Sequence, residues 1–258
     1  MSEVLTDERI ATVLRPFVRA TTPVLTTLRE SDPLGLRRRL HGEHERPPRR
    51  YDWLLHRLDR MRLPGSARWD AMTPRQRSEW WNRRIGRLVA VLAGVPSFGG
   101  AIASKLPVRD ALGLAGQGLL LVAIAGEHGL TDRGEQVRLL ASVVLGRELP
   151  TELAHDRTAD EDERTRELSG ELDDARGEGS RLPVRALART VWRMARALWE
   201  VGSALGNRTR GRFYHELLAL LPVVGFLGGY LGERSALKRI SRRGRRWLAI
   251  RQATPRES

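Results

Sequence analysis

Apolar residues recur at intervals of three and four along most of the chain, and the strict alternation that marks β-strands is scarce. Two long stripes show the helical spacing most clearly, one after residue 74 and one after residue 183. The first contains Trp81, Ile85, Leu88, Val89 and Leu92. The second contains Leu187, Val191, Met194, Ala195, Leu198, Trp199 and Leu205. This pattern predicts an all-α protein built as a helical bundle.

Local chemistry marks where two of the helices begin. Thr73 followed by Gln76 has the spacing of a capping box, in which two side chains satisfy the free amides of a first helical turn. Asp132 followed by Glu135 repeats the pattern, and Gly146 is the expected end of that second helix. Both helices are therefore predicted from their ends as well as from their periodicity.

The remaining patterns divide the chain into four parts. Residues 7–30 have helical spacing that Pro16 and Pro23 interrupt, and residues 36–50 are polar and contain prolines. Residues 151–180 are acidic with few apolar positions, which is typical of a solvated or disordered linker. The expected parts are an N-terminal helical and basic arm (1–65), the first half of a helical core (66–150), an acidic linker or insertion (151–180), and a second half with a basic tail (181–258).

Three stretches lack charged residues, namely 88–104, 111–126 and 217–232. Their lengths are 17, 16 and 16 residues, whereas a helix needs about 20 residues to cross the hydrocarbon of a bilayer. A full span is therefore marginal, and two interpretations stay open: Gly-rich helical hairpins buried in a soluble bundle, or hairpins partly inserted in lipid. Pairs of small residues four apart favour close helix packing in either setting. The helix-packing positions are Gly225, Gly228, Gly229 and Gly232.

The distribution of charge along the chain indicates which kinds of partner the protein could bind. The formal net charge is +14 and is unevenly placed, with basic stretches at 36–62 and 233–251 and an acidic one at 148–178. A basic surface suits the phosphates of nucleic acid or of anionic lipid headgroups, although a merely solvated surface carries about equal weight. The expected contacts to an anionic membrane surface follow the last apolar run. They are Lys238, Arg239, Arg242, Arg243, Arg245, Arg246 and Trp247.

The helix over 183–206 permits two interpretations. Its arginines lie mostly off the apolar stripe, and Trp192 and Trp199 could serve as anchors, as in a helix that lies in a membrane interface. A helix that faces the protein core and keeps a solvated basic face has the same composition. The core-facing interpretation is the preferred one.

Two segments resemble the EcsC family. They are WWNRRIGRLVAVLAGVPSFGGAIASKLPVRDALGLAGQGLLLVAIAGEHGL (80–130) and LLPVVGFLGGYLGERSALKRISRRGRRW (220–247). The shared features are an apolar helix that ends in a Gly/Pro turn, an apolar helix that begins with LP, and a PVVG…GG helix that leads into a basic tail. The resemblance implies a helical bacterial protein that is associated with membranes, with no established enzymatic activity and no catalytic residues to carry over.

Signatures of catalysis are missing from the sequence. The chain has no cysteine, which excludes disulfides and thiolate chemistry. There is no nucleophile elbow and no phosphate-binding loop, and HELLA (215–219) lacks the second histidine of a zinc-protease motif. We therefore expect no enzyme, no cofactor and no bound metal. Nucleic acid is an unlikely partner because no DNA- or RNA-reading motif accompanies the basic charge.

One polar cluster, Glu127 and His128, lies at the end of an apolar helix. The helix dipole would favour the charged form of a histidine there. Asp110, at the other end of the same helix, is about 25 Å away and cannot share a site with Glu127. The preferred role of Glu127 and His128 is to cap the end of a buried helix, and catalysis or ligand binding is the alternative.

These observations lead to three hypotheses. The first is a non-enzymatic, EcsC-like protein associated peripherally with anionic lipids, and with a membrane protein as a further partner. The second is a soluble helical module for protein interactions. The third is an unrecognised enzyme around Glu127 and His128. The first ten residues lack the pattern of a secretory signal, so the expected location is the cytoplasm, at the inner face of the cell membrane.

Overall fold

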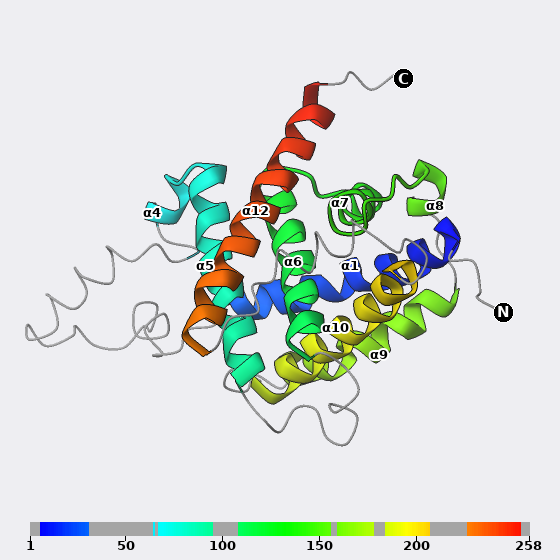
Figure 1. Cartoon of the computed structure of the whole chain (residues 1–258), viewed down its shortest axis with the longest axis horizontal. Helices are drawn as coiled ribbons and strands as arrows, with labels where there is room; N and C mark the ends of the chain where they lie inside the picture. Colours follow the sequence, from blue (N-terminus) through cyan, green and yellow to red (C-terminus); the bar gives the residue numbers. More distant parts are fainter. Residues whose placement is uncertain are drawn as a thin grey trace, which may run out of the picture.

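The structure is a computed structural model that describes residues 6–30, 64, 67–94, 108–155, 159–177, 184–206 and 226–253. Within these residues lie nine helices and no strand, which confirms the all-α prediction (Figure 1). The helices are α1 (Asp7–Glu30), α4 (Ala67–Asp70), α5 (Pro74–Gly94), α6 (Val108–Glu127), α7 (Arg133–Leu145), α8 (Thr151–His155), α9 (Ala159–Gly177), α10 (Val184–Gly206) and α12 (Phe226–Ala253).

The predicted helix starts are both present. The Thr73 hydroxyl accepts a hydrogen bond from the Gln76 amide, and the Gln76 side chain accepts one from the Thr73 amide, so the capping box of α5 is complete. Asp132 caps α7 by accepting from the Glu135 amide at 2.7 Å. The Glu135 carboxylate does not complete this second box, because it binds arginines from α7 and α12.

Helix α6 lies at the centre of the bundle. Every residue from Ala111 to Ala125 is buried, and α5, α10, α12, α7 and α1 pack around the helix. Small residues bring two of these neighbours close. A Cβ atom on Gly116 would lie 2.6 Å from Cγ2 of Val89 in α5, and one on Gly118 would lie 2.7 Å from Cζ of Phe17 in α1. Among the described helices, α6 alone has the length and hydropathy of a membrane span, and 83% of that window is buried inside the protein.

The surroundings of two glycines inside helices predict opposite effects of a change to alanine on the free energy of unfolding. Gly118→Ala should lower the free energy of unfolding by about 1–2 kcal/mol, because overpacking against the Phe17 ring exceeds the gain in helix propensity. Gly170→Ala in α9 should raise it by about 0.5–1 kcal/mol, because no atom lies within 4 Å of the added methyl. Urea unfolding of the two variants measures both values. Equal effects of the two changes would contradict the tight α6–α1 contact.

Helix α1 is continuous through its two prolines, so the prediction that they interrupt the helix is wrong. Pro16 and Pro23 both lie inside a continuous helix of 24 residues. Proline 16 leaves the carbonyl of Thr12 without its usual helical donor, and the Arg164 side chain of α9 approaches that carbonyl at 3.5 Å. The apolar side of α1 is buried against α9, α10, α7 and α6. This part of the predicted N-terminal arm is therefore a core helix, while residues 36–50 lie outside the described residues.

The acidic stretch also differs from the prediction. Residues 151–155 and 159–177 form α8 and α9 rather than a solvated or disordered linker, and α9 packs along α1 and α10. Its acidic side chains face arginines of those helices: Arg15 Nη2 lies 2.5 Å from Glu161 Oε1, and Arg193 Nη2 lies 3.1 Å from Glu171 Oε2. The acidic composition alone predicted a solvated linker, because the arginines that pair with these acids lie in other helices and, for Arg15, more than a hundred residues earlier in the sequence.

Helix α10 follows the core-facing interpretation. Leu187, Val191 and Leu198 are buried, and the helix packs on α6, α1 and α9. Trp192 and Trp199 are partly buried against the same core, so they do not form an exposed interfacial edge. On the basic side of α10, Arg189 and Arg193 contact Glu171 of the acidic α9.

The Gly-rich hairpin prediction is only partly covered by the structure. The stretch 111–126 lies within α6, but most of 217–232 and part of 88–104 lie outside the described residues. Gly225 is among the residues not described. Gly228, Gly229 and Gly232 lie in the first turns of α12, and their surroundings are outside the described part of the chain. Their role in helix packing stays a prediction.

Candidate functional site

The exposed side of α12 is strongly basic. Lys238, Arg242 and Arg246 follow one another at intervals of four and are exposed, and Arg243 is exposed beside them. We call these four residues the basic face. From residue 236 to the end of the helix, α12 contains no acidic residue. Among the described residues, none forms an ion pair with the basic face.

The opposite side of α12 fixes the direction in which the basic face points. Leu237, Ile240 and Leu248 are buried, and Gly244 allows the backbone to approach Leu121 of α6, where a Cβ atom would clash. Figure 1 shows α12 (orange to red) beside α5 and α6, and away from α9 and α10. The basic face is therefore held outward by packing and is not a consequence of a loosely attached helix.

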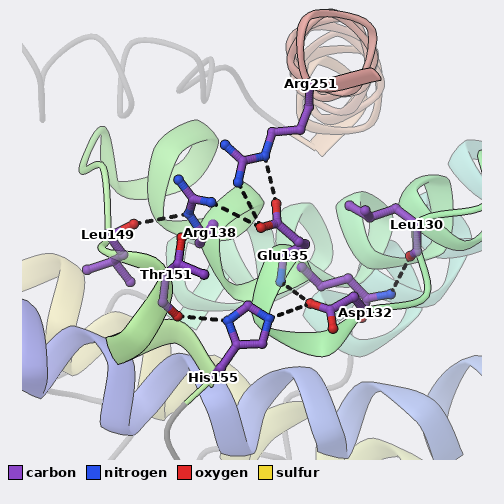
Figure 2. A network of polar contacts seen from close by, with 9 residues as sticks. Leu130, Asp132, Glu135, Arg138, Leu149, Thr151, His155 and Arg251 are labelled. Carbon is purple, nitrogen blue, oxygen red and sulfur yellow. Dashed lines mark hydrogen bonds and ion pairs between the residues drawn. The ribbon is translucent and has the colours of Figure 1, made fainter. Parts of the chain in front are cut away.

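A polar network attaches the C-terminal end of α12 to α7 (Figure 2). The Arg251 guanidinium donates two hydrogen bonds of 2.8 Å to the two carboxylate oxygens of Glu135. Arg138 donates to the same carboxylate at 3.0 Å, and Glu135 is only 13% exposed. A bidentate, partly buried arginine–carboxylate pair has stricter geometry than an ordinary surface pair. It holds the end of α12 at a fixed place on the bundle.

His155 extends this network and was not singled out from the sequence. Its Nδ1 lies 2.7 Å from the Thr151 carbonyl and its Nε2 lies 2.9 Å from Asp132 Oδ1. Both partners are acceptors, so the doubly protonated ring satisfies both contacts. The bond to the Thr151 carbonyl raises the pKa of His155, and Asp132 adds to the rise. The ring lies against Gly134, where any Cβ atom would clash with it.

This geometry predicts a pH-dependent contribution of His155 to stability. Because the pKa is raised in the folded protein, the stabilisation is fully present below the ordinary histidine pKa of about 6.5 and is lost as the pH rises through the folded value. His155→Gln should therefore destabilise the protein more at pH 5.5 than at pH 8.5. Urea unfolding of both proteins at the two pH values measures the difference, and a loss that is independent of pH would contradict the charged ring.

The basic face differs from the arginines of α1 and α10 that have carboxylate partners. Arg19 of α1 lies 2.8 Å from Asp162, and Arg189 and Arg193 of α10 both contact Glu171. The carboxylates of α9 thus neutralise the positive charge of these arginines on α1 and α10. Helix α5 adds to the opposite surface through Arg75, Arg83 and Arg87, which are exposed. The excess positive charge of the described residues is therefore concentrated on α5 and α12.

Three of the seven predicted contact residues have other surroundings. Arg239 and Arg245 are half-buried, and Arg245 donates to the Ser241 hydroxyl at 2.8 Å. Trp247 is packed against the core, with the Arg251 guanidinium 5.5 Å from its ring centroid. It is therefore not a freely exposed interfacial aromatic. Among the described side chains of α12, Ile250 is a large apolar residue that is exposed, with 61% of its surface accessible, and it lies one turn beyond Arg246.

Glu127 is a structural carboxylate at the junction of three helices. Its side chain is 5% exposed, and it accepts hydrogen bonds from Arg29 at 2.7 Å and from the Trp81 ring nitrogen at 3.0 Å. Arg77 lies 3.5 Å from its other oxygen. The carboxylate thus joins the end of α6 to α1 and α5. Its contacts agree with the preferred role of capping the end of a buried helix.

The charge prediction for His128 is wrong. Burial lowers the pKa of His128, and the nearby Arg245 lowers it further, against a smaller opposite effect of Glu127. These two influences act against the helix dipole, which favours the charged ring. Its backbone carbonyl accepts a hydrogen bond from Gln252 of α12 at 3.2 Å. Burial also raises the pKa of Asp110, at the other end of α6.

The structure contains one hollow with a charged lining within the described residues. An open hollow of about 630 Å³ lies between α9 and α10, and its charged lining includes Arg166, Glu167, Arg193, Arg196 and Glu200. Arg193 and Arg196 are engaged with Glu171 and Glu200, respectively. Within the described part of the chain, no cluster of three or more His, Asp or Glu residues could hold a metal ion.

Comparison with protein-family models, with curated proteins and with solved structures found no match to this chain. The resemblance to the EcsC family therefore stays a prediction from the two segments that carry it.

Proposed function

We propose that this chain is a non-enzymatic, EcsC-like helical protein that docks on the cytoplasmic face of the cell membrane through the basic face of α12. The observation that carries the proposal is the uneven neutralisation of charge. Acidic α9 pairs with arginines of α1 and α10, whereas the basic face has no carboxylate partner among the described residues. Such a surface attracts anionic lipid headgroups.

The mode of contact follows from the burial of α6. Its apolar window is occupied by protein contacts, so it supports surface docking rather than insertion of this helix. Ile250 lies beside the basic face and would reach the boundary between headgroups and acyl chains. Basic residues around one exposed apolar side chain suit a reversible, salt-sensitive attachment.

Membrane fractionation of cells that produce the protein tests this proposal. The protein should sediment with membranes at low ionic strength and be released by high salt, because exposed charges are screened within about 3 Å at 1 M salt. Retention through both high salt and alkaline carbonate would contradict surface docking and indicate insertion. Recovery in the cytosol alone would contradict membrane association.

The second candidate is a soluble helical module for protein interactions. It is favoured by one observation: α6, the helix among the described ones with the hydropathy of a membrane span, has 83% of that window buried inside the protein. In that case the basic face would contact an acidic protein, and recovery in the cytosol is its expected result.

A further inference from the structure

Helix α9 is attached to the bundle in two different ways along its length. In its first half, the fully buried carboxylate of Glu161 lies 2.5 Å from the buried Arg15 of α1. In its second half, Glu171 is 34% exposed and pairs with Arg189 and Arg193 of α10. Salt screens exposed pairs strongly and buried pairs much less. The second half, residues 170–177, therefore has the weaker electrostatic attachment, and we call it the acidic lid.

A pair of helix-weakening residues separates the two halves. Ser169 and Gly170 are adjacent in the middle of α9, and such Gly/Ser pairs are sites where helices bend. The Ser169 hydroxyl donates to the carbonyl of Thr165 at 3.2 Å, a contact that also favours a bend. No atom lies within 4 Å of a Cβ placed on Gly170, so packing does not require a glycine there. The pair therefore has the properties of a hinge.

The acidic lid has few apolar anchors. Leu172 is fully buried and Ala175 is partly buried against the core, whereas Asp173 and Asp174 are exposed. The open hollow of about 630 Å³ between α9 and α10 lies immediately before the lid, at residues 166–168. The described anchors of the lid are thus one ion-paired carboxylate and two apolar side chains.

The acidic lid covers two guanidinium groups of α10 that bind a carboxylate well. Each oxygen of Glu171 accepts one hydrogen bond, from Arg189 at 2.5 Å and from Arg193 at 3.1 Å. Two guanidinium groups share this one carboxylate, so the surface keeps an excess of positive charge. The ligand that the structure shows on this surface is an acidic helix with Leu172 beside the paired glutamate. Another helix of the same chemistry fits the same contacts.

We propose that Arg189 and Arg193 form a docking surface for an acidic helix of a partner protein, and that the acidic lid occupies this surface as an intramolecular competitor. The inference goes beyond the proposed function and does not rest on it, because α10 lies away from α12 and its basic face (Figure 1). A competitor within the same chain lowers the apparent affinity for the partner in proportion to the fraction of molecules that are closed. Bending at Ser169 and Gly170 frees both guanidinium groups and leaves the first half of α9 in place.

Hydrogen exchange of the full-length protein tests the hinge without any partner. Raising the salt from about 0.05 to 1 M should speed exchange in residues 170–177 about tenfold and in residues 159–168 less than about twofold. Gly170→Ala should slow exchange in the lid about two- to fivefold. Gly126→Ala, at another helical glycine with no atom within 4 Å, should leave α9 unchanged. Equal acceleration of the two halves by salt would overturn the hinged lid.

A synthetic peptide tests the docking surface. The probe is residues 165–177 with Gly170→Ala, which favours the helix, and its affinity is measured by fluorescence anisotropy. The Glu171→Gln protein should bind this peptide about tenfold more tightly than the wild-type protein does, because its own lid competes less. Glu163→Gln, which removes an exposed carboxylate of α9 that pairs within the same helix, should bind like the wild-type protein.

The remaining variants identify where the peptide binds. Adding Arg189→Gln/Arg193→Gln to the Glu171→Gln protein should abolish binding of the peptide. Binding that survives this change, or no binding to the Glu171→Gln protein at millimolar peptide, would overturn the docking surface. Equal affinity of the Glu171→Gln and wild-type proteins would overturn the competition by the lid. None of these outcomes involves vesicles, so membrane docking stands or falls separately.

Discussion

Glu161→Gln should reduce the free energy of unfolding by about 3 kcal/mol, which makes it the largest single-residue effect expected outside the apolar core. The Glu161 side chain is fully buried between α9 and α1, with Arg15 at 2.5 Å and Arg19 at 3.7 Å. Glutamine keeps the shape and removes the charge, so the buried Arg15 is left without its counter-charge. A loss of this size would lower the midpoint of thermal unfolding by about 6–12 °C in a protein of this length.

The matched control and the rescue make the result specific. Glu163→Gln removes an exposed carboxylate that pairs with Arg166 on the same helix, and should change stability by less than about 0.5 kcal/mol. Arg15→Met/Glu161→Leu removes both charges together and should recover most of the stability, because an apolar pair has no desolvation cost. If Glu161→Gln is as mild as the control, α9 is not held to α1 by this buried pair.

Neutralising the basic face should produce the largest effect on binding. Each basic residue near an anionic leaflet contributes about 1 kcal/mol, and screening reduces the sum for Lys238, Arg242, Arg243 and Arg246 to about 2–4 kcal/mol. Replacing all four by Gln should therefore weaken binding to phosphatidylglycerol vesicles between about thirtyfold and several hundredfold. The four side chains are exposed, so the fold should be unaffected. Circular dichroism and a vesicle-binding isotherm measure the two quantities.

Salt dependence provides an independent check on the same prediction. The affinity of the wild-type protein should fall steeply as salt is raised from 50 to 500 mM, and that of the fourfold variant should change little. A wild-type affinity that is insensitive to salt would indicate apolar attachment and contradict electrostatic docking.

Local patterns in the sequence predicted much of the fold. Thr73 and Asp132 cap the helices that follow them, and most of the two apolar stripes is buried as expected. The buried positions are Trp81, Ile85, Val89, Leu92, Leu187, Val191, Met194, Ala195 and Leu198. These features depend on residues within one or two helical turns of each other. Periodicity and capping therefore reveal them without knowledge of the tertiary structure.

Long-range pairing accounts for the errors. Helix α9 has few apolar positions, and its acids resembled those of a solvated linker because Arg15 and Arg19 lie more than 140 residues earlier. One signal was present: Leu168, Leu172 and Ala175 have helical spacing, and Leu172 is fully buried. Helix α1 passes through its prolines because its neighbours bury it on several sides, which sequence periodicity cannot show.

The candidate site was predicted in outline and corrected in detail. The four residues of the basic face are exposed as expected, but Trp247 packs inward and Ile250 takes the exposed apolar position. Burial lowers the pKa of Arg245, and the charge of Arg75, which is 170 residues away in the sequence, lowers it further. The contact of His155 with Asp132, which lies 23 residues earlier, could not follow from spacing along the chain.

Co-sedimentation of two variants of equal charge with phosphatidylglycerol vesicles tests the central claim most directly. One variant neutralises the basic face, and the other replaces four exposed arginines on α7, α9 and α10 with Gln: Arg133, Arg166, Arg185 and Arg196. If the basic face is the docking surface, only the first variant should remain in the supernatant at low salt, and the second should sediment nearly as well as the wild-type protein. Equal loss in both variants would show that net charge alone attracts the protein to the vesicles, and would contradict a docking surface on α12.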